Sequence, residues 1–246
     1  MSAPTRTTVD YPTSDGKPMA ETDLHRDEMF DSIRTLEDRY ADRDDVYVSG
    51  NLLIYYERGN KRKHVAPDTF VVFGVPKRKR LYYLAWEEGK FPDVLIEITS
   101  KTTKREDLQT KKEIYRTIFK AKEYFLFDPT GDYLKDRLRG FRRVRGQWKP
   151  IAVVNGTLFC KTLGLELHVD GIRLRFFDPE AGKYLLNPLE RAEKAEEAVR
   201  SERARADSAQ TAQRRLAEEN ERLRREIEAL RRPRPNGGNG HPPQPT

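Results

Sequence analysis

The order of apolar and polar positions predicts a mixed α/β domain followed by a long helix. Apolar residues recur at helical spacing between Glu21 and Arg39, which predicts an amphipathic helix. Two runs rich in β-branched and aromatic residues come next, Val46–Tyr56, which Gly50 interrupts, and Asp68–Gly74. Both runs predict strands, and Leu81–Trp86 predicts a short edge strand.

A strand, a helix and another strand are predicted in the middle of the chain. Asp93–Ile98 is almost entirely apolar, as is typical of strands covered on both faces. Asp107–Phe119 has helical periodicity, and Glu123–Phe127 is a short apolar run. This order favours a right-handed crossover between two parallel strands. The region 133–178 predicts a β-rich periphery of short strands and turns.

The C-terminal region has the heptad spacing of a coiled coil. Leu216, Leu223 and Leu230 fall seven residues apart, and Asn220 and Ile227 occupy the intervening seam positions. An asparagine at such a position favours a two-stranded parallel pairing. The alternative is a solvated single helix, because the seam is polar before Leu216.

Composition divides the chain into four parts. Apolar residues make up 36% of it and charged residues 35%, which indicates that part of the chain lies outside a packed core. We expect a flexible N-terminal arm over 1–18, an α/β domain over 19–187, a coiled-coil helix over 188–232 and a disordered tail over 233–246.

Charge and cysteine content narrow the class of protein. The net charge of +7 favours polyanionic partners such as nucleic acid. The single cysteine, Cys160, excludes an internal disulfide and fits a reducing compartment. No segment has the apolar length of a membrane span or the apolar core of a signal peptide. We therefore expect a cytoplasmic protein without a membrane segment.

Two acidic residues on neighbouring predicted strands are candidates for chemistry. Asp68 begins one strand, and Glu97 lies inside the apolar run of the other. A buried carboxylate has either a polar partner or a function, because an isolated buried charge is costly. Acids on two strands can converge on one divalent cation, and their hard oxygens suit Mg²⁺ or Mn²⁺. Such a cation can polarise a phosphodiester and activate water. A structural salt bridge, or a hydrogen bond to a neighbouring helix, is the other interpretation.

Two basic runs flank the strand that begins at Asp68. They could bind phosphates without sequence specificity, although runs of this kind are often simply solvated turns. The candidate nucleic-acid-binding residues are Lys61, Arg62, Lys63, Lys77, Arg78, Lys79 and Arg80.

The acidic positions and the region after them resemble the PD-(D/E)XK nuclease superfamily, and more closely its Uma-two family of restriction-endonuclease-like proteins. The resemblance covers roughly 20–180. Its elements are Pro67-Asp68, then Pro92-Asp93 with Glu97, then Ser100, Thr102 and Thr103, then Asp107-Leu108, Lys111 and Tyr115, and finally Glu123-Tyr124-Phe125-Leu126-Phe127-Asp128-Pro129.

The resemblance implies an α/β restriction-endonuclease-like core with a mixed sheet flanked by helices, and roles for several residues. Asp68 and Glu97 would hold Mg²⁺ or Mn²⁺, with the backbone carbonyl of Ile98 as a further ligand. The family pattern places a lysine two residues after the second acid, where this chain has Thr99. Lys111 is the replacement candidate, because it shares a helical stripe with core residues. The alternative is a surface lysine whose ammonium extends into solvent.

Further residues have secondary roles in this interpretation. Lys101, which stands where the family commonly has proline, and Lys112 are the fallback lysines. Glu21 and His25 on the first helix are either accessory residues of the metal site or ordinary residues of the helix surface. Asp93 is expected to be structural, because four residues of strand separate it from Glu97 by about 13 Å. Asp128 is expected to cap the turn that follows it.

These observations predict a divalent-metal-dependent endonuclease that hydrolyses DNA phosphodiester bonds. Homodimers formed through the coiled coil could cut both strands. The alternative is a non-catalytic DNA-binding or scaffold protein with a nuclease-like fold, which the absence of a lysine at Thr99 supports. A nuclease that acts on RNA is a third possibility.

Overall fold

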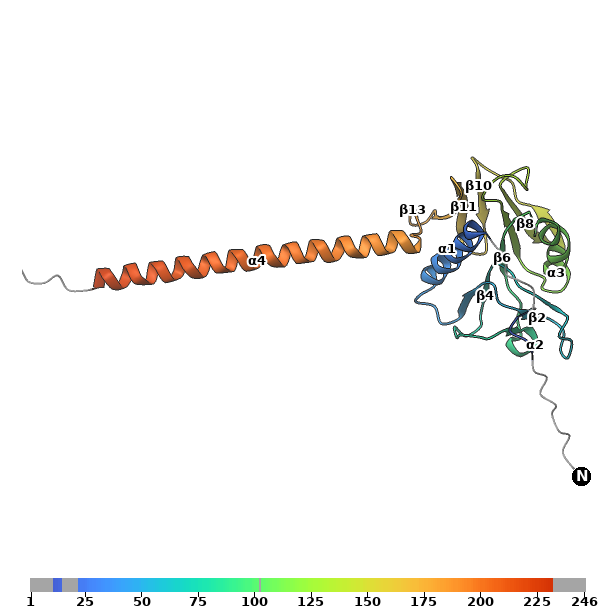
Figure 1. Cartoon of the computed structure of the whole chain (residues 1–246), viewed down its shortest axis with the longest axis horizontal. Helices are drawn as coiled ribbons and strands as arrows, with labels where there is room; N and C mark the ends of the chain where they lie inside the picture. Colours follow the sequence, from blue (N-terminus) through green and yellow to red (C-terminus); the bar gives the residue numbers. More distant parts are fainter. Residues whose placement is uncertain (1–10, 15–21, 102, 232–246) are drawn as a thin grey trace, which may run out of the picture. The chain divides into compact units, whose positions relative to one another are not determined.

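A computed structural model describes residues 11–14, 22–101 and 103–231. The chain divides into two compact units, the first ending at Glu190 and the second beginning at Arg191. The first unit contains all of the strands and the first three α-helices, and the second contains most of the long helix α4 (Figure 1). The mixed α/β class predicted from the sequence is confirmed.

A six-stranded mixed sheet forms the centre of the first unit. Only β6 and β7 are parallel to each other, and the other neighbours are antiparallel. In spatial order the strands are β1 (Val46–Ser49), β4 (Thr69–Phe73), β6 (Val94–Ile98), β7 (Glu123–Phe127), β8 (Leu138–Val144) and β9 (Gln147–Pro150). The predicted parallel pair on either side of a helix is therefore confirmed.

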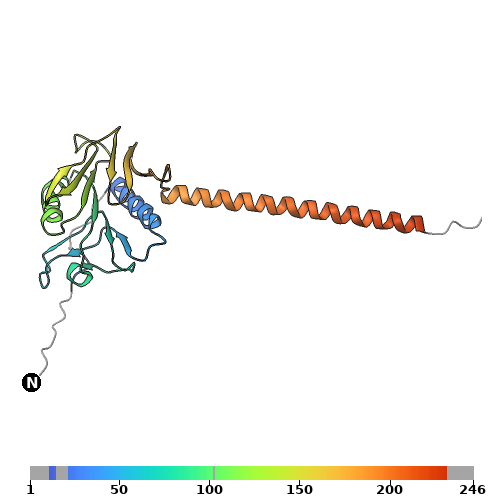
Figure 2. The same ribbon diagram turned by 180° about the vertical axis from the view of Figure 1, so that it is seen from behind.

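The two faces of this sheet are covered by different helices. Every residue of β6 and β7 is buried, as expected for strands packed on both faces. The helix α1 (Asp23–Arg39) packs on the face that carries Ile96, and α3 (Lys112–Thr117) on the face that carries Leu95 (Figures 1 and 2). Alternation along the strands thus directs successive side chains into two separate cores.

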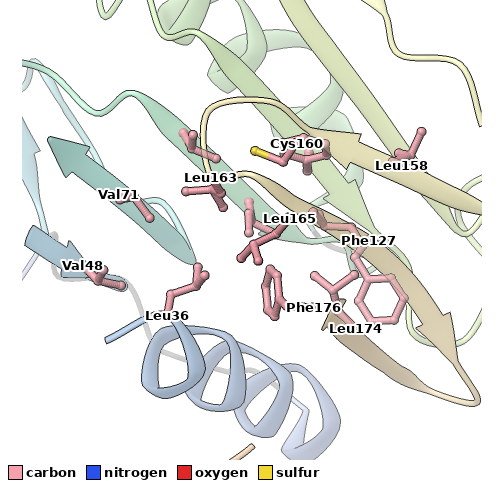
Figure 3. Packing of buried hydrophobic residues seen from close by; sticks show 14 of the residues in the cluster. Leu36, Val48, Val71, Phe127, Leu158, Cys160, Leu163, Leu165, Leu174 and Phe176 are labelled. Carbon is pink, nitrogen blue, oxygen red and sulfur yellow. The ribbon is translucent and has the colours of Figure 1, made fainter. Parts of the chain in front are cut away.

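A second sheet completes the core on the α1 side. Its strands are β10 (Thr157–Cys160), β11 (Leu165–Asp170), β12 (Arg173–Asp178) and β13 (Lys183–Tyr184). Leu165 and Phe176 from this sheet pack with Leu36 of α1 and Phe127 of β7 (Figure 3). The predicted β-rich periphery is therefore wrong in part: β8 and β9 extend the central sheet, and the second sheet supplies core residues. The alternation of side chains in this region indicates strands, but their burial depends on tertiary packing.

A small three-stranded sheet is formed by segments between residues 54 and 84. The strands β3 (His64–Val65), β2 (Ile54–Tyr55) and β5 (Tyr83–Leu84) form this sheet, and the short helix α2 (Ala85–Glu88) follows β5. The predicted edge strand is thus shorter than Leu81–Trp86.

Tyr11 corrects the prediction of a flexible arm over 1–18. Its side chain is buried against Tyr55, Tyr82 and Trp86, and its hydroxyl accepts a hydrogen bond from the Gly59 backbone. Burial of a large aromatic ring is favourable and offsets the loss of chain freedom at this position. The rest of the predicted arm lies outside the described residues, apart from 12–14.

The helix α4 (Pro188–Arg231) is continuous over 44 residues. It begins with a capping box, in which the Asn187 side chain accepts a hydrogen bond from the Glu190 backbone and the Glu190 side chain accepts one from the Asn187 backbone. None of its residues is buried. The predicted helix is confirmed, whereas its pairing as a coiled coil stays a prediction. No helix in the described part of the chain is both long and apolar enough to cross a bilayer.

Candidate active site

The carboxylates of Asp68 and Glu97 lie next to each other on adjacent strands. Because Thr69 is opposite Ile96 in the antiparallel pair, Asp68 falls beside Glu97. The Asp68 backbone N–H donates to Glu97 Oε2 (3.2 Å), and the Ile98 backbone N–H donates to Asp68 Oδ2 (2.7 Å). Glu97 is fully buried and Asp68 is 8% exposed. The pair is therefore held by backbone hydrogen bonds as well as by sheet register.

Gly50 allows the backbone to approach Asp68 closely. A Cβ atom at Gly50 would lie 1.9 Å from the Asp68 carbonyl oxygen, far inside a van der Waals contact. The next residue, Asn51, donates its backbone N–H to the Pro67 carbonyl (2.8 Å). The glycine that interrupts the first predicted strand thus supports the segment that carries Asp68.

Lys111 reaches the Glu97 carboxylate from the helical segment above the sheet. Its Nζ atom lies 2.8 Å from Glu97 Oε2 and 3.2 Å from Asp107 Oδ1. The other oxygen of Glu97 accepts a hydrogen bond from the Tyr115 hydroxyl (2.6 Å). The prediction that Lys111 points toward the sheet is confirmed.

The helix that carries Lys111 differs from the predicted one. The structure has a π-helix, η1 (Glu106–Lys111), followed by α3, which ends at Thr117, in place of a continuous α-helix over Asp107–Phe119. Hydrogen bonds of the i→i+5 type define the π segment, and such segments occur frequently at functional sites. The 3.6-residue pattern in the sequence indicates a helix but not this local change of winding.

Burial and mutual charge interactions shift the pKa values of this cluster. Burial raises the pKa of Glu97 well above its ordinary value, and Lys111 opposes the shift only partly. Burial likewise raises the pKa of Asp107. Burial also acts against the charge of Lys111, but the carboxylates of Glu97, Asp68 and Asp107 outweigh it and raise its pKa well above the usual range.

The pKa of Asp68 is lowered, unlike the pKa values of Glu97 and Asp107. Burial acts to raise its pKa, but Lys111, a hydrogen bond from His25 and the Ile98 backbone outweigh that effect and lower it. His25 Nε2 lies 3.4 Å from Asp68 Oδ2. His25 stands in the first turn of α1, where its backbone N–H is capped by the Thr22 hydroxyl (3.2 Å). The helix start therefore positions this histidine beside the acid.

The remaining accessory candidates have separate positions. Glu21 lies outside the described residues. Lys101 is exposed and lines a cavity of about 170 Å³ together with His25, Ile98 and Thr99. Thr99 itself is 2% exposed. The structure therefore places a small buried side chain at the position where the family pattern has a lysine.

Asp107 and the hydroxyl of Tyr115 also belong to this cluster, although in the sequence they are only elements of the family resemblance, without a role at the site. Asp107 is fully buried, and its backbone carbonyl accepts a hydrogen bond from the Tyr124 hydroxyl (2.9 Å). One sequence signal could have found it, because Asp107 shares the core-facing stripe with Lys111. An acid on such a stripe needs a cationic partner.

Two other acids of the motif region have structural roles, as predicted. Asp93 accepts a hydrogen bond from the Phe73 backbone (2.9 Å) and pairs with Lys122 (2.9 Å). Asp128 is fully buried and accepts backbone hydrogen bonds from Gly131 and Leu134 in the turn that follows it.

The basic run at Lys77 is largely occupied by contacts within the domain. Lys77 donates to the carbonyls of Tyr40 and Ala41 (2.9 Å each) at the end of α1. Arg78 and Arg80 both pair with Glu88 (2.8 and 2.7 Å).

The other candidate cations are more accessible. Lys79 has 93% of its side chain accessible, and its ammonium lies 3.9 Å from Glu37 Oε1. Lys61, Arg62 and Lys63 are all exposed in the β2–β3 loop. These three residues and Lys79 are therefore the cations of the two runs that a phosphate backbone could reach most easily.

The donor chemistry of the acidic pair suits a divalent cation. Two carboxylates and a backbone carbonyl match the preference of Mg²⁺, which is commonly held by one or two carboxylates and keeps several waters. Within residues 11–14, 22–101 and 103–231, no three His, Cys, Asp or Glu side chains gather as a metal-holding group. Asp68 and Glu97, with the carbonyl of Ile98, are the residues that would hold such a cation.

The first unit is therefore a mixed α/β domain in which an acidic pair and a lysine meet at the central sheet. The chain belongs to the Uma2 family, described as "Putative restriction endonuclease", whose model matches residues 5–191. Among solved structures, it is similar to "a putative nuclease belonging to DUF820 from Anabaena variabilis", with 15% identity and a TM-score of 0.43 over 60% of this chain and 76% of that one. No curated protein matches it.

Proposed function

We propose that this protein is a divalent-metal-dependent endonuclease that hydrolyses phosphodiester bonds of DNA. The observation that carries the proposal is the contact of Lys111 with Glu97, 2.8 Å apart, beside a second acid on the neighbouring strand. Membership of the Uma2 family supports the nuclease class. The metal, the substrate and the roles of the residues are our inference from the chemistry of these side chains.

Each residue has a distinct role in the proposal. Asp68 and Glu97, with the Ile98 carbonyl, would hold the cation. A bound Mg²⁺ or Mn²⁺ would supply Lewis acidity to the phosphate and lower the pKa of water. The Tyr115 hydroxyl fixes the orientation of Glu97 through its 2.6 Å hydrogen bond.

Lys111 would act through its positive charge. The surrounding carboxylates raise its pKa well above the usual range against the effect of burial, so the side chain stays an ammonium at neutral pH. An ammonium cannot accept a proton from water, but it stabilises negative charge that develops on the phosphate. His25, 3.4 Å from Asp68, would orient that carboxylate.

The test is cleavage of supercoiled plasmid by the purified protein with Mg²⁺ or Mn²⁺, beside an EDTA control. Asp68→Asn and Glu97→Gln keep the shape of each side chain and remove its charge, so we expect both to abolish metal-dependent cutting. Asp93→Asn is the matched control, because Asp93 is an acid of the same region with structural partners. Unchanged cutting by folded Asp68→Asn or Glu97→Gln protein contradicts the proposal.

The buried Thr99 favours a second candidate, a non-catalytic DNA-binding or scaffold protein with the same fold. It predicts binding to plasmid that weakens with salt and requires no metal, with no cutting under any condition. Offering single-stranded RNA in the same assay separates both from a nuclease that acts on RNA. We also propose that the protein self-associates as a homodimer through α4.

A further inference from the structure

The helix α4 carries an apolar stripe that has no cover in the described part of the chain. Leu216, Leu223, Ile227 and Leu230 are 60%, 48%, 50% and 81% exposed. Together with Asn220 they follow the alternating three- and four-residue spacing of a coiled-coil seam. Burial of such a surface against a partner is favourable, because apolar area is removed from water.

The charged residues beside the apolar stripe are complementary to those of a second copy of α4. Glu219 and Glu226 precede the seam residues Asn220 and Ile227, and Arg224 and Arg231 follow Leu223 and Leu230. In heptad terms the glutamates are at g positions and the arginines at e positions. In a parallel, in-register pair, each g residue faces the e residue five positions further along the other helix.

In that arrangement Glu219 faces Arg224 of the second copy, and Glu226 faces Arg231. Both contacts join opposite charges, and the two-fold symmetry of the pair repeats each of them. An antiparallel pairing of this segment with itself brings g to g and e to e, which joins glutamate with glutamate and arginine with arginine. The sequence of one helix is thus complementary to itself only in the parallel orientation.

Ion pairs within α4 leave this arrangement undisturbed. Arg214 pairs with Glu218 (3.1 Å), and Arg225 pairs with Glu221. These residues occupy the b and f positions of the same heptads, on the side of the helix away from the seam. The flanking charges that would bridge two copies are different residues.

The residue types at the seam favour a coiled coil of two helices. Ile227 is β-branched at an a position, and Leu216, Leu223 and Leu230 are at d positions, a combination that favours parallel dimers over trimers and tetramers. Asn220 would face Asn220 of the second copy, where their amides can hydrogen-bond to each other and fix the register.

We propose that α4 is the interface of a parallel, in-register homodimer, with Glu219–Arg224 and Glu226–Arg231 as its interchain ion pairs. Both chains then enter the coil at the Pro188 end. The inference goes beyond the proposed nuclease function, and its tests measure mass, so their outcome is independent of cutting.

The first test is disulfide cross-linking of full-length Asn220→Cys protein. A parallel, in-register pair brings the two introduced thiols together at the seam, so we expect a covalent dimer under mild oxidation. The native Cys160 is fully buried, so the wild type serves as the blank, and Arg225→Cys at an outer position is the matched control. A monomeric Asn220→Cys product, or equal cross-linking of both variants, overturns the proposal.

The second test is charge reversal, followed by sedimentation of the full chain. Glu219→Lys with Glu226→Lys turns each proposed interchain pair into a repulsion, and we expect the dimer dissociation constant to rise at least about tenfold. Adding Arg224→Glu and Arg231→Glu restores opposite charges, so the fourfold variant should dimerise like the wild type. Failure of the fourfold variant to recover contradicts the parallel arrangement, as does a monomeric wild type.

Discussion

The ammonium of Lys111 lies 2.8 Å from Glu97 and 3.2 Å from Asp107, so a single buried cation joins an acid of the central sheet to an acid of its own helical segment. Asp68 lies beside Glu97 and adds a third carboxylate to the surroundings of Lys111. This relationship makes the lysine important for the fold as well as for the proposed chemistry, and the two contributions can be separated by experiment.

Replacement of Lys111 by methionine should impair both stability and cutting. Removing one partner of a buried ion pair costs about 3–5 kcal/mol, so we expect the free energy of unfolding in urea to fall by about 3 kcal/mol. Metal-dependent cutting should fall at least about 100-fold. Lys101→Ala is the control, because Lys101 is exposed and should change neither quantity. Loss of cutting in Lys101→Ala alone would move the role to Lys101.

Asp107→Asn should reduce cutting while it changes the free energy of unfolding little. Burial raises the pKa of Asp107, which means that the fold disfavours its ionised form. We therefore expect the neutral amide to leave the free energy of unfolding within about 1 kcal/mol of the wild type. Cutting should fall about 10- to 100-fold, as for residues that orient a reacting group. A loss of stability as large as that of Lys111→Met would show that Asp107 serves the fold.

Glu28 should make the stability of the domain depend on pH. Burial raises its pKa to about 7, against the opposing effects of the Leu174 backbone N–H and Arg173. Between its unfolded value and about 7, the folded state keeps a proton that the unfolded state has lost. The stability contributed by the protonated carboxyl is therefore present at low pH and is lost as the pH rises through about 7.

Glu28→Gln tests this dependence, because the amide oxygen can still accept the hydrogen bond from Leu174. Urea unfolding of both proteins at about pH 5 and about pH 8 supplies the comparison. The stability of the wild type relative to Glu28→Gln should decrease from the lower pH to the higher one. An increase, or a constant difference, would contradict the raised pKa.

Arg80→Met should lower stability rather than DNA affinity. The Arg80 side chain is 3% exposed, pairs with Glu88 at 2.7 Å, and lies 4.1 Å above the Tyr47 ring. Removing it leaves a buried carboxylate with one fewer cation, so we expect a loss of about 2–3 kcal/mol in unfolding free energy. Lys79→Ala, at an exposed position of the same turn, should stay within about 0.5 kcal/mol of the wild type. Equal stability of the two variants would argue against the structural role.

Combined Lys61→Ala, Arg62→Ala and Lys63→Ala substitutions should weaken DNA binding without affecting the fold. All three side chains are exposed, so unfolding by urea should be unchanged. If these cations neutralise phosphates, the slope of log K against log salt concentration becomes shallower by about 0.9 for each phosphate that the variant no longer neutralises. Fluorescence anisotropy of a labelled duplex over a salt series measures this slope. An unchanged slope would exclude the loop from the DNA-binding surface.

The elements whose pattern is local were predictable from the sequence. The nearly continuous apolar run Asp93–Ile98 indicated a strand buried on both faces, and β6 is buried at every residue. The heptads predicted a helix that the structure describes as α4. The core-facing stripe directed Lys111 toward the sheet, where its ammonium lies.

Other features depended on partners distant in the sequence. Asp107 became part of the acidic cluster, and Tyr11 became a core residue, only because other segments pack against them. The π-helical winding of Glu106–Lys111 does not alter the apolar pattern enough to be seen in the sequence.

The sequence by itself determined the order of strands and helices, the two acids and the charge pattern of α4, because periodicity and side-chain chemistry act over neighbouring residues. The tertiary structure decided that Asp68 lies beside Glu97, that Lys111 is shared between Glu97 and Asp107, and that the cations of the Lys77 run contact the domain itself. The physical reason is that strand register, burial and ion pairing are set between segments that meet only when the sheet is assembled.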